Sequence, residues 1–130
     1  MRAWSALLID TDVLIDYLRG EPNALAYLKA ARGPLRVSCL TLAELYVGAR
    51  DDAERNALAR LEGLLEPVQV DRDIAVQAGL FRREYGRTHG TGLVDALIAA
   101  SALATQSRLV TLNARHFPMV RAVIIPYRKP

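Results

Sequence analysis

The stretch that decides the fold is Leu7-Leu8-Ile9-Asp10-Thr11-Asp12, in which a short apolar run ends abruptly on acidic and hydroxyl side chains. Such a run is typical of a buried strand in a parallel sheet, followed directly by a helix. Two more acids, Glu44 and Asp95, stand where an apolar run ends or a helical pattern begins. Only a fold that delivers strand ends to one edge of a sheet would bring these distant acids together.

The rest of the chain alternates short apolar or β-branched runs with longer helical patterns. We expect strands at residues 3–9, 36–40, 68–70, 108–111 and 122–125, and helices at 12–18, 23–31, 42–50, 53–65, 72–88 and 93–105. Strands separated by helices require crossovers and favour a parallel sheet. The 130 residues, 52% of them hydrophobic, are enough for one core. We therefore predict one domain over residues 1–130, a three-layer α/β/α fold with a mainly parallel central sheet of four to five strands.

The amino-acid composition limits the kinds of catalytic and metal sites that the chain can form. Cys39 is the only cysteine, so an internal disulfide and a cysteine-based zinc site are excluded, and we interpret it as a small core residue. Its alternative as a nucleophile requires His89 or His116 close by. The net charge is +3, and almost all of the positive side chains are arginines, whose guanidinium groups are suited to binding phosphates. No apolar run is long enough to cross a bilayer, and no cleavable leader is recognisable, so we expect a cytoplasmic protein without membrane contact.

Each acid except Asp10 also has a structural interpretation. Thr41-Leu42-Ala43-Glu44 has the form of a capping box, in which Glu44 bonds the backbone N–H of Thr41. Asp12 is placed to cap the helix after the first strand, and Asp95 lies in a first helical turn, where the helix dipole favours negative charge. Asp10 directly follows the apolar run and has no such explanation.

Grouped carboxylates repel one another, and this repulsion raises their pKa values unless a cation neutralises the group. Oxygen ligands without sulfur or imidazole favour hard ions, so we expect Mg²⁺ or Mn²⁺. Such an ion orients water for attack on phosphorus and stabilises the charge that develops on the leaving oxygen. The acids therefore indicate phosphodiester hydrolysis.

Four segments together carry a resemblance that spans the chain. They are Leu7-Leu8-Ile9-Asp10-Thr11-Asp12-Val13-Leu14-Ile15, Thr41-Leu42-Ala43-Glu44-Leu45-Tyr46-Val47-Gly48-Ala49, Gly92-Leu93-Val94-Asp95-Ala96-Leu97-Ile98-Ala99-Ala100-Ser101-Ala102 and Leu109-Val110-Thr111-Leu112-Asn113-Ala114-Arg115-His116-Phe117. In this order they resemble the motifs of PIN-domain ribonucleases, and specifically of VapC-type toxins from toxin–antitoxin pairs.

The resemblance implies roles for individual residues. Asp10, Glu44 and Asp95 would be the catalytic, metal-binding acids, with Thr11, Asp12 and Thr111 as supporting polar groups. The fourth motif departs from the family, because Asn113 and His116 stand where many relatives have an aspartate. We expect Asn113 to offer an uncharged amide oxygen at the catalytic site, so that one metal is bound firmly and a second only weakly.

Several basic residues have two interpretations. His116 would either contact the scissile phosphate or protonate the leaving oxygen, or else pack beside Phe117. His89 reads as a helix C-terminal residue. Arg82, Arg83 and Arg87 form either a solvated helix face or, with Arg115, a track for the RNA backbone.

The function that the resemblance implies is metal-dependent endoribonuclease activity, leaving 5′-phosphate and 3′-hydroxyl ends. The partners it implies are an RNA substrate, a cognate VapB-type antitoxin and a second copy of the chain in a homodimer. The resemblance implies that the antitoxin covers an apolar groove, which residues 14–18 and 42–47, with Tyr17, Leu45 and Tyr46, are placed to provide. The alternative for these side chains is ordinary core packing, which we favour for most of them. Two alternatives remain: a degenerate PIN module that binds RNA or protein without cutting, and a Mg²⁺-binding phospho-acceptor domain, for which Val70-Asp71 is a poor match and the required lysine is absent.

Overall fold

The computed structural model describes residues 5–129. Its strands are β1 (Leu7–Ile9), β2 (Leu35–Ser38), β3 (Glu66–Val68) and β4 (Arg108–Val110). Its helices are α1 (Thr11–Leu18), α2 (Pro22–Ala30), α3 (Cys39–Gly48), α4 (Asp52–Glu62), α5 (Arg72–His89), α6 (Leu93–Ala104) and the 3₁₀ turn η1 (Ala114–His116). The four strands form one parallel sheet in the order β3-β2-β1-β4. The predicted fold class is confirmed.

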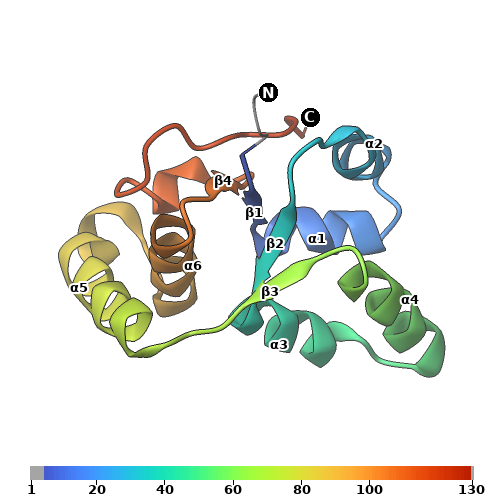
Figure 1. The fold of residues 1–130 in the computed structure, drawn as a ribbon, viewed down its shortest axis with the longest axis horizontal. Helices are drawn as coiled ribbons and strands as arrows, with labels where there is room; N and C mark the ends of the chain where they lie inside the picture. The colour runs from blue at the N-terminus through green and yellow to red at the C-terminus, as the bar shows by residue number, and fades with distance from the viewer. Residues whose placement is uncertain (1–4, 130) are drawn as a thin grey trace.

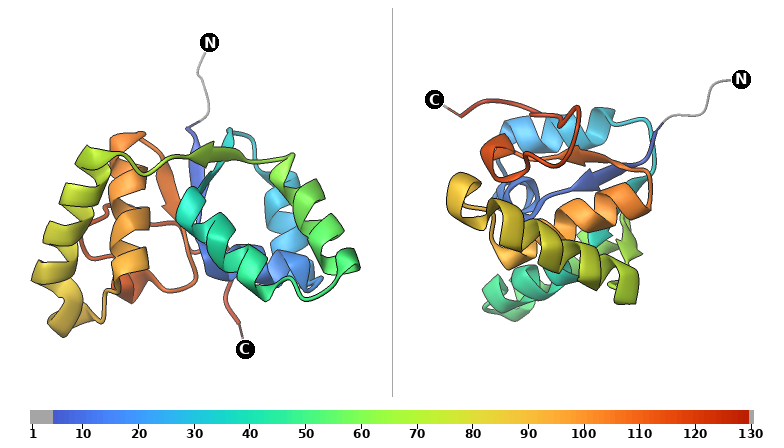
Figure 2. Two further views of the ribbon diagram at one scale, coloured as in Figure 1. Left: turned by 90° about the horizontal axis from the view of Figure 1, so that it is seen from below. Right: turned by 90° about the vertical axis from the view of Figure 1, so that its left-hand side faces the viewer.

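Helices cover both faces of the sheet, as Figures 1 and 2 show. The α5–α6 pair lies on one side of the strands, and α1 to α4 lie on the other. This division follows from the alternation of side chains along each strand. Leu8 and Leu109, which are paired in register, point to the α5–α6 side, whereas Ile9 and Val110 point to the side of α1 and α3.

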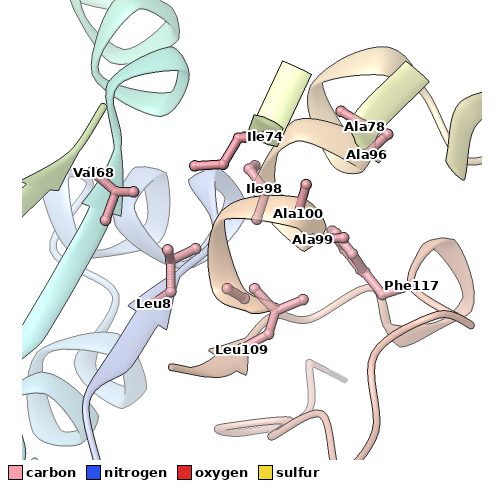
Figure 3. Close-up of a cluster of buried hydrophobic side chains, with 11 residues drawn as sticks. Leu8, Val68, Ile74, Ala78, Ala96, Ile98, Ala99, Ala100, Leu109 and Phe117 are labelled. Atoms are coloured by element: carbon pink, nitrogen blue, oxygen red, sulfur yellow. The ribbon is translucent and has the colours of Figure 1, made fainter. Parts of the chain in front are cut away.

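The core on the α5–α6 side includes Phe117, which directly follows η1 (Figure 3). Phe117, 1% exposed, packs there with Leu8, Leu109 and the alanine-rich face of α6. Small side chains on α6 let this helix lie close to both α5 and the sheet. Packing of Phe117 therefore fixes η1 and the residues next to it.

Three strand predictions need correction. The second strand ends at Ser38, because its hydroxyl accepts a hydrogen bond from the Leu40 N–H at 3.1 Å and starts α3 early. The third strand is residues 66–68 rather than 68–70 and contains Pro67, which an edge strand tolerates. The fifth strand is reduced to one parallel bridge between Val110 and Ile124. Ala122, at φ +53°, interrupts the extended chain just before it.

Most other boundaries lie within a few residues of their predicted positions. Residues 3 and 4 of the predicted first strand lie outside the described part of the chain. Asp71 caps α5 as expected, with Oδ1 accepting from the Ile74 N–H at 2.9 Å. His89 is the last residue of α5, followed by Gly90 in the left-handed conformation at φ +67°. Within residues 5–129, each helix is too short or too polar to span a bilayer.

We predict that Leu8→Ala destabilises the protein by about 2–5 kcal/mol, because it removes a fully buried side chain from a central strand packed between two helix layers. Urea unfolding followed by circular dichroism measures the loss. Leu64→Ala is the matched control, since Leu64 is 61% exposed and its truncation should change stability by less than about 1 kcal/mol. Equal effects of the two substitutions would contradict this account of the core.

Candidate active site

The candidate site lies where the order of the strands reverses. The chain passes from β1 to β2 on one side, while β4 lies on the other side of β1. Parallel sheets bind ligands outside the carboxyl ends of their strands at such a point. Asp10 directly follows β1 and Thr111 directly follows β4, so both side chains stand at this crevice.

Asp10 is the most buried acid of the site, at 6% exposure. Its Oδ1 accepts a hydrogen bond from the Thr11 N–H at 2.8 Å, and its Oδ2 accepts one from the Thr111 hydroxyl at 2.7 Å. The first bond makes Asp10 the N-cap of α1. The second joins the ends of β1 and β4, which holds the carboxylate in one orientation.

Asp12 plays a different part from the predicted helix cap, because Asp10 holds the capping position of α1. Asp12 Oδ1 accepts from the Val13 N–H at 2.7 Å, within the first turn of α1. Its Oδ2 accepts from the Leu112 N–H at 3.1 Å and lies 3.4 Å from the Thr111 hydroxyl. The hydroxyl of Thr111 thus stands between the two carboxylates. Asp12 therefore ties the start of α1 to the loop after β4.

Glu44 reaches the site from α3, and the predicted capping box is wrong. Helix α3 begins at Cys39 with Ser38 as its cap, so Glu44 lies beyond the first turn. Its Oε1 accepts from the Thr11 hydroxyl at 2.9 Å, while Thr11 Oγ1 lies 3.0 Å from Thr41 Oγ1. The carboxylate is exposed and is held beside the start of α1 by hydroxyl groups.

Asp95 comes from the first turn of α6, as predicted. Its Oδ2 accepts from the Gly92 N–H at 3.0 Å, a capping interaction that the sequence analysis did not predict. The same oxygen lies 3.3 Å from Nδ1 of His116. The Asn113 amide nitrogen lies 2.9 Å from that Nδ1, so the segment after β4 brings His116 to Asp95 and Asn113 to His116.

The acids influence one another through their charges. Burial raises the pKa of Asp10 to about 7; the negative charges of Asp12 and Asp95 add to this rise, while the hydrogen bonds from Thr111 and Thr11 oppose it. Burial likewise raises the pKa of Asp12. A cation would relieve this repulsion and restore the ionised form of Asp10.

The donors available are carboxylate, hydroxyl and amide oxygens, which suit a hard divalent ion. Asp10, Glu44 and Asp95 would hold it, with Thr11, Asp12 and Thr111 orienting them through the bonds described above. Among residues 5–129, however, no three His, Cys, Asp or Glu side chains are grouped closely enough to hold a metal as they stand. Ion binding would require side-chain rotation, and the metal site stays a prediction.

The basic residues are less closely tied to the acids. Arg82, Arg83, Arg87 and Arg115 are all exposed, the first three on α5 and the last in η1. The guanidinium of Arg82 lies over Gly86, where a β-carbon would overlap it. A solvated surface is enough to explain why these arginines are exposed. RNA contact at these residues stays a prediction.

Two site residues escaped sequence reasoning. Thr41 is fully buried and approaches Thr11, but its place in a capping-box pattern suggested a local role. Thr91, 1% exposed, donates its hydroxyl to the His116 carbonyl at 2.8 Å. Its position between two glycines signalled only a turn, and the contact depends on the tertiary approach of η1 to α6.

A parallel α/β/α domain with acids gathered at its strand ends is the architecture of a nuclease-like PIN domain. The model of the family described as PIN domain matches residues 7–122, so the chain belongs to the PIN domain family. Ribonuclease VapC10 of Mycobacterium tuberculosis is 42% identical over 127 residues, covering 95% of each chain. Ribonuclease VapC19 of the same species is 40% identical, covering 92% of this chain and 98% of the relative.

Solved structures agree with this assignment. A toxin–antitoxin complex from Klebsiella pneumoniae contains a chain that superposes with a TM-score of 0.82 at 28% identity. The match covers 95% of this chain and 99% of that one. The family resemblance drawn from the four motifs is confirmed, and the phospho-acceptor alternative is wrong.

We predict that Asp10→Asn stabilises the metal-free protein above pH 7. The pKa of Asp10 rises from 3.8 to about 7 on folding, so its ionisation costs stability progressively as pH rises between these values. The amide stays uncharged throughout this pH range, and the advantage over wild type should grow from near zero at pH 4 to roughly 2–4 kcal/mol at pH 8.

Urea unfolding in chelator across this pH range measures the difference. Asp73→Asn is the control, because the Asp73 side chain is 88% exposed on α5 and its substitution should give no such pH dependence. An Asp10→Asn variant that is less stable than wild type at pH 8 would contradict the electrostatic description of the site.

Proposed function

We propose that the chain is a metal-dependent endoribonuclease and the toxin of a VapBC-type toxin–antitoxin pair. The observation that carries the catalytic part is the buried Asp10 carboxylate, whose charge is opposed by Asp12 and Asp95. A site that disfavours its own ionised form in this way is suited to a divalent cation. The similarity to two enzymes named as ribonucleases supports RNA as the substrate.

Each side chain has a defined task in this proposal. Asp10 is fixed between Thr11 and Thr111, and Glu44 is fixed by the Thr11 hydroxyl. Since Glu44 is exposed, its carboxylate can accept a proton from an attacking water. Asp95 is oriented by the Gly92 N–H. A bound Mg²⁺ or Mn²⁺ would supply charge stabilisation at the scissile phosphate and lower the pKa of water.

The test is cleavage of total bacterial RNA by the purified chain, with sequencing of the new 5′-phosphate ends. Cleavage should require Mg²⁺ or Mn²⁺, stop with chelator, and fall on the order of 100-fold or more in Asp10→Asn. The exposed Asp73→Asn variant should cut like wild type. Metal-independent cutting would exclude the proposed chemistry, and no cutting with intact RNA binding would favour the degenerate module.

An apolar groove supports the regulatory part of the proposal. Its volume is about 570 Å³, and α1, α3 and α4 line it with Ile15, Leu18, Leu45 and Leu58. Glu44 also lines this groove, so a peptide lying there would reach the catalytic acids. Tyr46 lies elsewhere, where its hydroxyl bonds Glu62, and Tyr17 faces a different pocket. The two tyrosines therefore fall outside the groove that was predicted to include them.

We predict that Gly48→Leu weakens inhibition by the cognate antitoxin about tenfold or more and leaves RNA cleavage intact. Beyond the backbone of its own helix, a β-carbon at Gly48 meets no atom within 4 Å, so a side chain added here has room to enter the groove that Gly48 lines. Inhibition is titrated with the product of the neighbouring gene. Gly79→Leu on α5, equally unobstructed, is the control. Unchanged inhibition of the Gly48 variant would place the antitoxin elsewhere.

The homodimer stays a prediction. Val47, Leu93 and Leu103 are exposed apolar side chains on α3 and α6, at 86%, 56% and 48%. Apolar side chains at such exposure are suited to subunit contact. Light scattering with and without the antitoxin measures the stoichiometry, and a monomer throughout would remove the dimer.

A further inference from the structure

We propose that His116 is itself a ligand of the catalytic ion, so that the site of this chain combines nitrogen and oxygen donors and prefers first-row transition ions such as Mn²⁺ over Mg²⁺. The inference rests on the proposed metal-dependent function. It adds a metal ligand and an ion preference to that function. Both come from the fourth motif, which has Asn113 and His116 and no carboxylate.

The spacing of the polar atoms supports this role. Nδ1 of His116 lies 3.3 Å from Oδ2 of Asp95. Two donors that bind one ion at about 2.1–2.2 Å and at right angles stand roughly 3 Å apart. The imidazole and the carboxylate therefore already have nearly the separation of neighbouring ligands.

A third group converges on the same ring nitrogen. The Asn113 amide approaches Nδ1 of His116 to 2.9 Å, measured from the amide nitrogen. A rotation of the amide plane by a half turn places its oxygen there instead. Asp95, His116 and Asn113 thus form a compact set of three possible donors from α6 and the loop after β4.

The position of His116 is fixed by the fold. The backbone carbonyl of His116 accepts from the buried Thr91 hydroxyl at 2.8 Å, and its backbone N–H donates to the Asn113 carbonyl at 3.1 Å. A β-carbon on Gly90 would lie 3.4 Å from Nε2, so the ring stands against the turn between α5 and α6. Groups that hold a ligand in this way favour metal binding, because less freedom is lost when the ion enters.

The chemistry of the ring sets the preference among ions. Mg²⁺ binds oxygen almost exclusively, whereas first-row transition ions accept imidazole nitrogen, with an affinity that rises from Mn²⁺ to Cu²⁺. Replacing the usual aspartate by His116 removes a charge that Mg²⁺ needs and adds a donor that Mg²⁺ uses poorly. The ratio of Mn²⁺ to Mg²⁺ affinity should therefore exceed that of a variant with an aspartate here.

The experiment is electron spin echo spectroscopy of untagged, chelator-treated protein loaded with Mn²⁺. Wild type should show the nitrogen coupling of a directly bound imidazole, and His116→Gln should lose it. The matched control is His89→Gln, because the chain has two histidines and His89 lies on α5 with Nδ1 against Thr88. His89→Gln should keep the signal.

Calorimetry adds an independent measurement. His116→Asp should lower the ratio of Mn²⁺ to Mg²⁺ affinity about tenfold or more. An absent nitrogen coupling in wild type, its persistence in His116→Gln, or an unchanged affinity ratio in His116→Asp would each overturn the proposal.

Failure of this inference is distinguishable from failure of the proposed function. Mn²⁺ that binds in a manner dependent on Asp10 and supports RNA cleavage, yet shows no nitrogen coupling, removes His116 as a ligand and leaves the ribonuclease intact. A protein that binds no Mn²⁺ and cuts no RNA removes both.

Discussion

The structure depends on the placement of one buried carboxylate. Asp10 ends the central strand β1, caps α1 and accepts the Thr111 hydroxyl from the end of β4. One side chain therefore joins two strands and a helix at the edge where ligands bind. Burial and neighbouring acids disfavour its ionised form, and this unfavourable electrostatics is what a divalent ion would relieve. The same residue thus organises the fold locally and is the acid of the site best suited to bind a cation.

A second buried acid, Asp16, has its charge balanced by a lysine of the same chain. Asp16 on α1 is 5% exposed, accepts the Tyr127 hydroxyl at 2.7 Å and lies 2.8 Å from the Lys129 ammonium. Burial would raise the pKa of Asp16, but the lysine, the tyrosine hydroxyl and Arg19 together hold it below its usual value. This acid is neutralised within the chain and fastens the C-terminal segment to α1. Within residues 5–129 the hydrogen-bond partners of the Asp10 carboxylate are a hydroxyl and an N–H group, and this contrast separates a structural carboxylate from a candidate ligand.

The fourth motif gives this PIN domain its individual character. Where an aspartate is common, His116 stands beside Asp95 and Asn113, positioned by Thr91 and by the packing of Phe117. In the role proposed for His116, an imidazole nitrogen would take the place of a carboxylate oxygen among donors that are otherwise oxygens. Residues that position η1 therefore bear on the chemistry as well as on the core.

The sequence by itself determined the α/β class, the order of the elements and the family, because the strand-helix alternation and the four motifs are local patterns. It also indicated Asp10, Glu44 and Asp95 as candidate metal-binding acids, and the structure places Asp10 directly after β1, Asp95 in the first turn of α6 and Glu44 in the middle of α3. Tertiary structure alone decided their distant partners: Glu44 bonds Thr11 rather than its own helix, and Asp12 bonds Leu112 in addition to the Val13 N–H in the first turn of α1. Local patterns left these alternatives open, since a carboxylate can satisfy nearby or distant donors equally well. Packing of α1, α3 and the β4 loop against one another selected the distant donors.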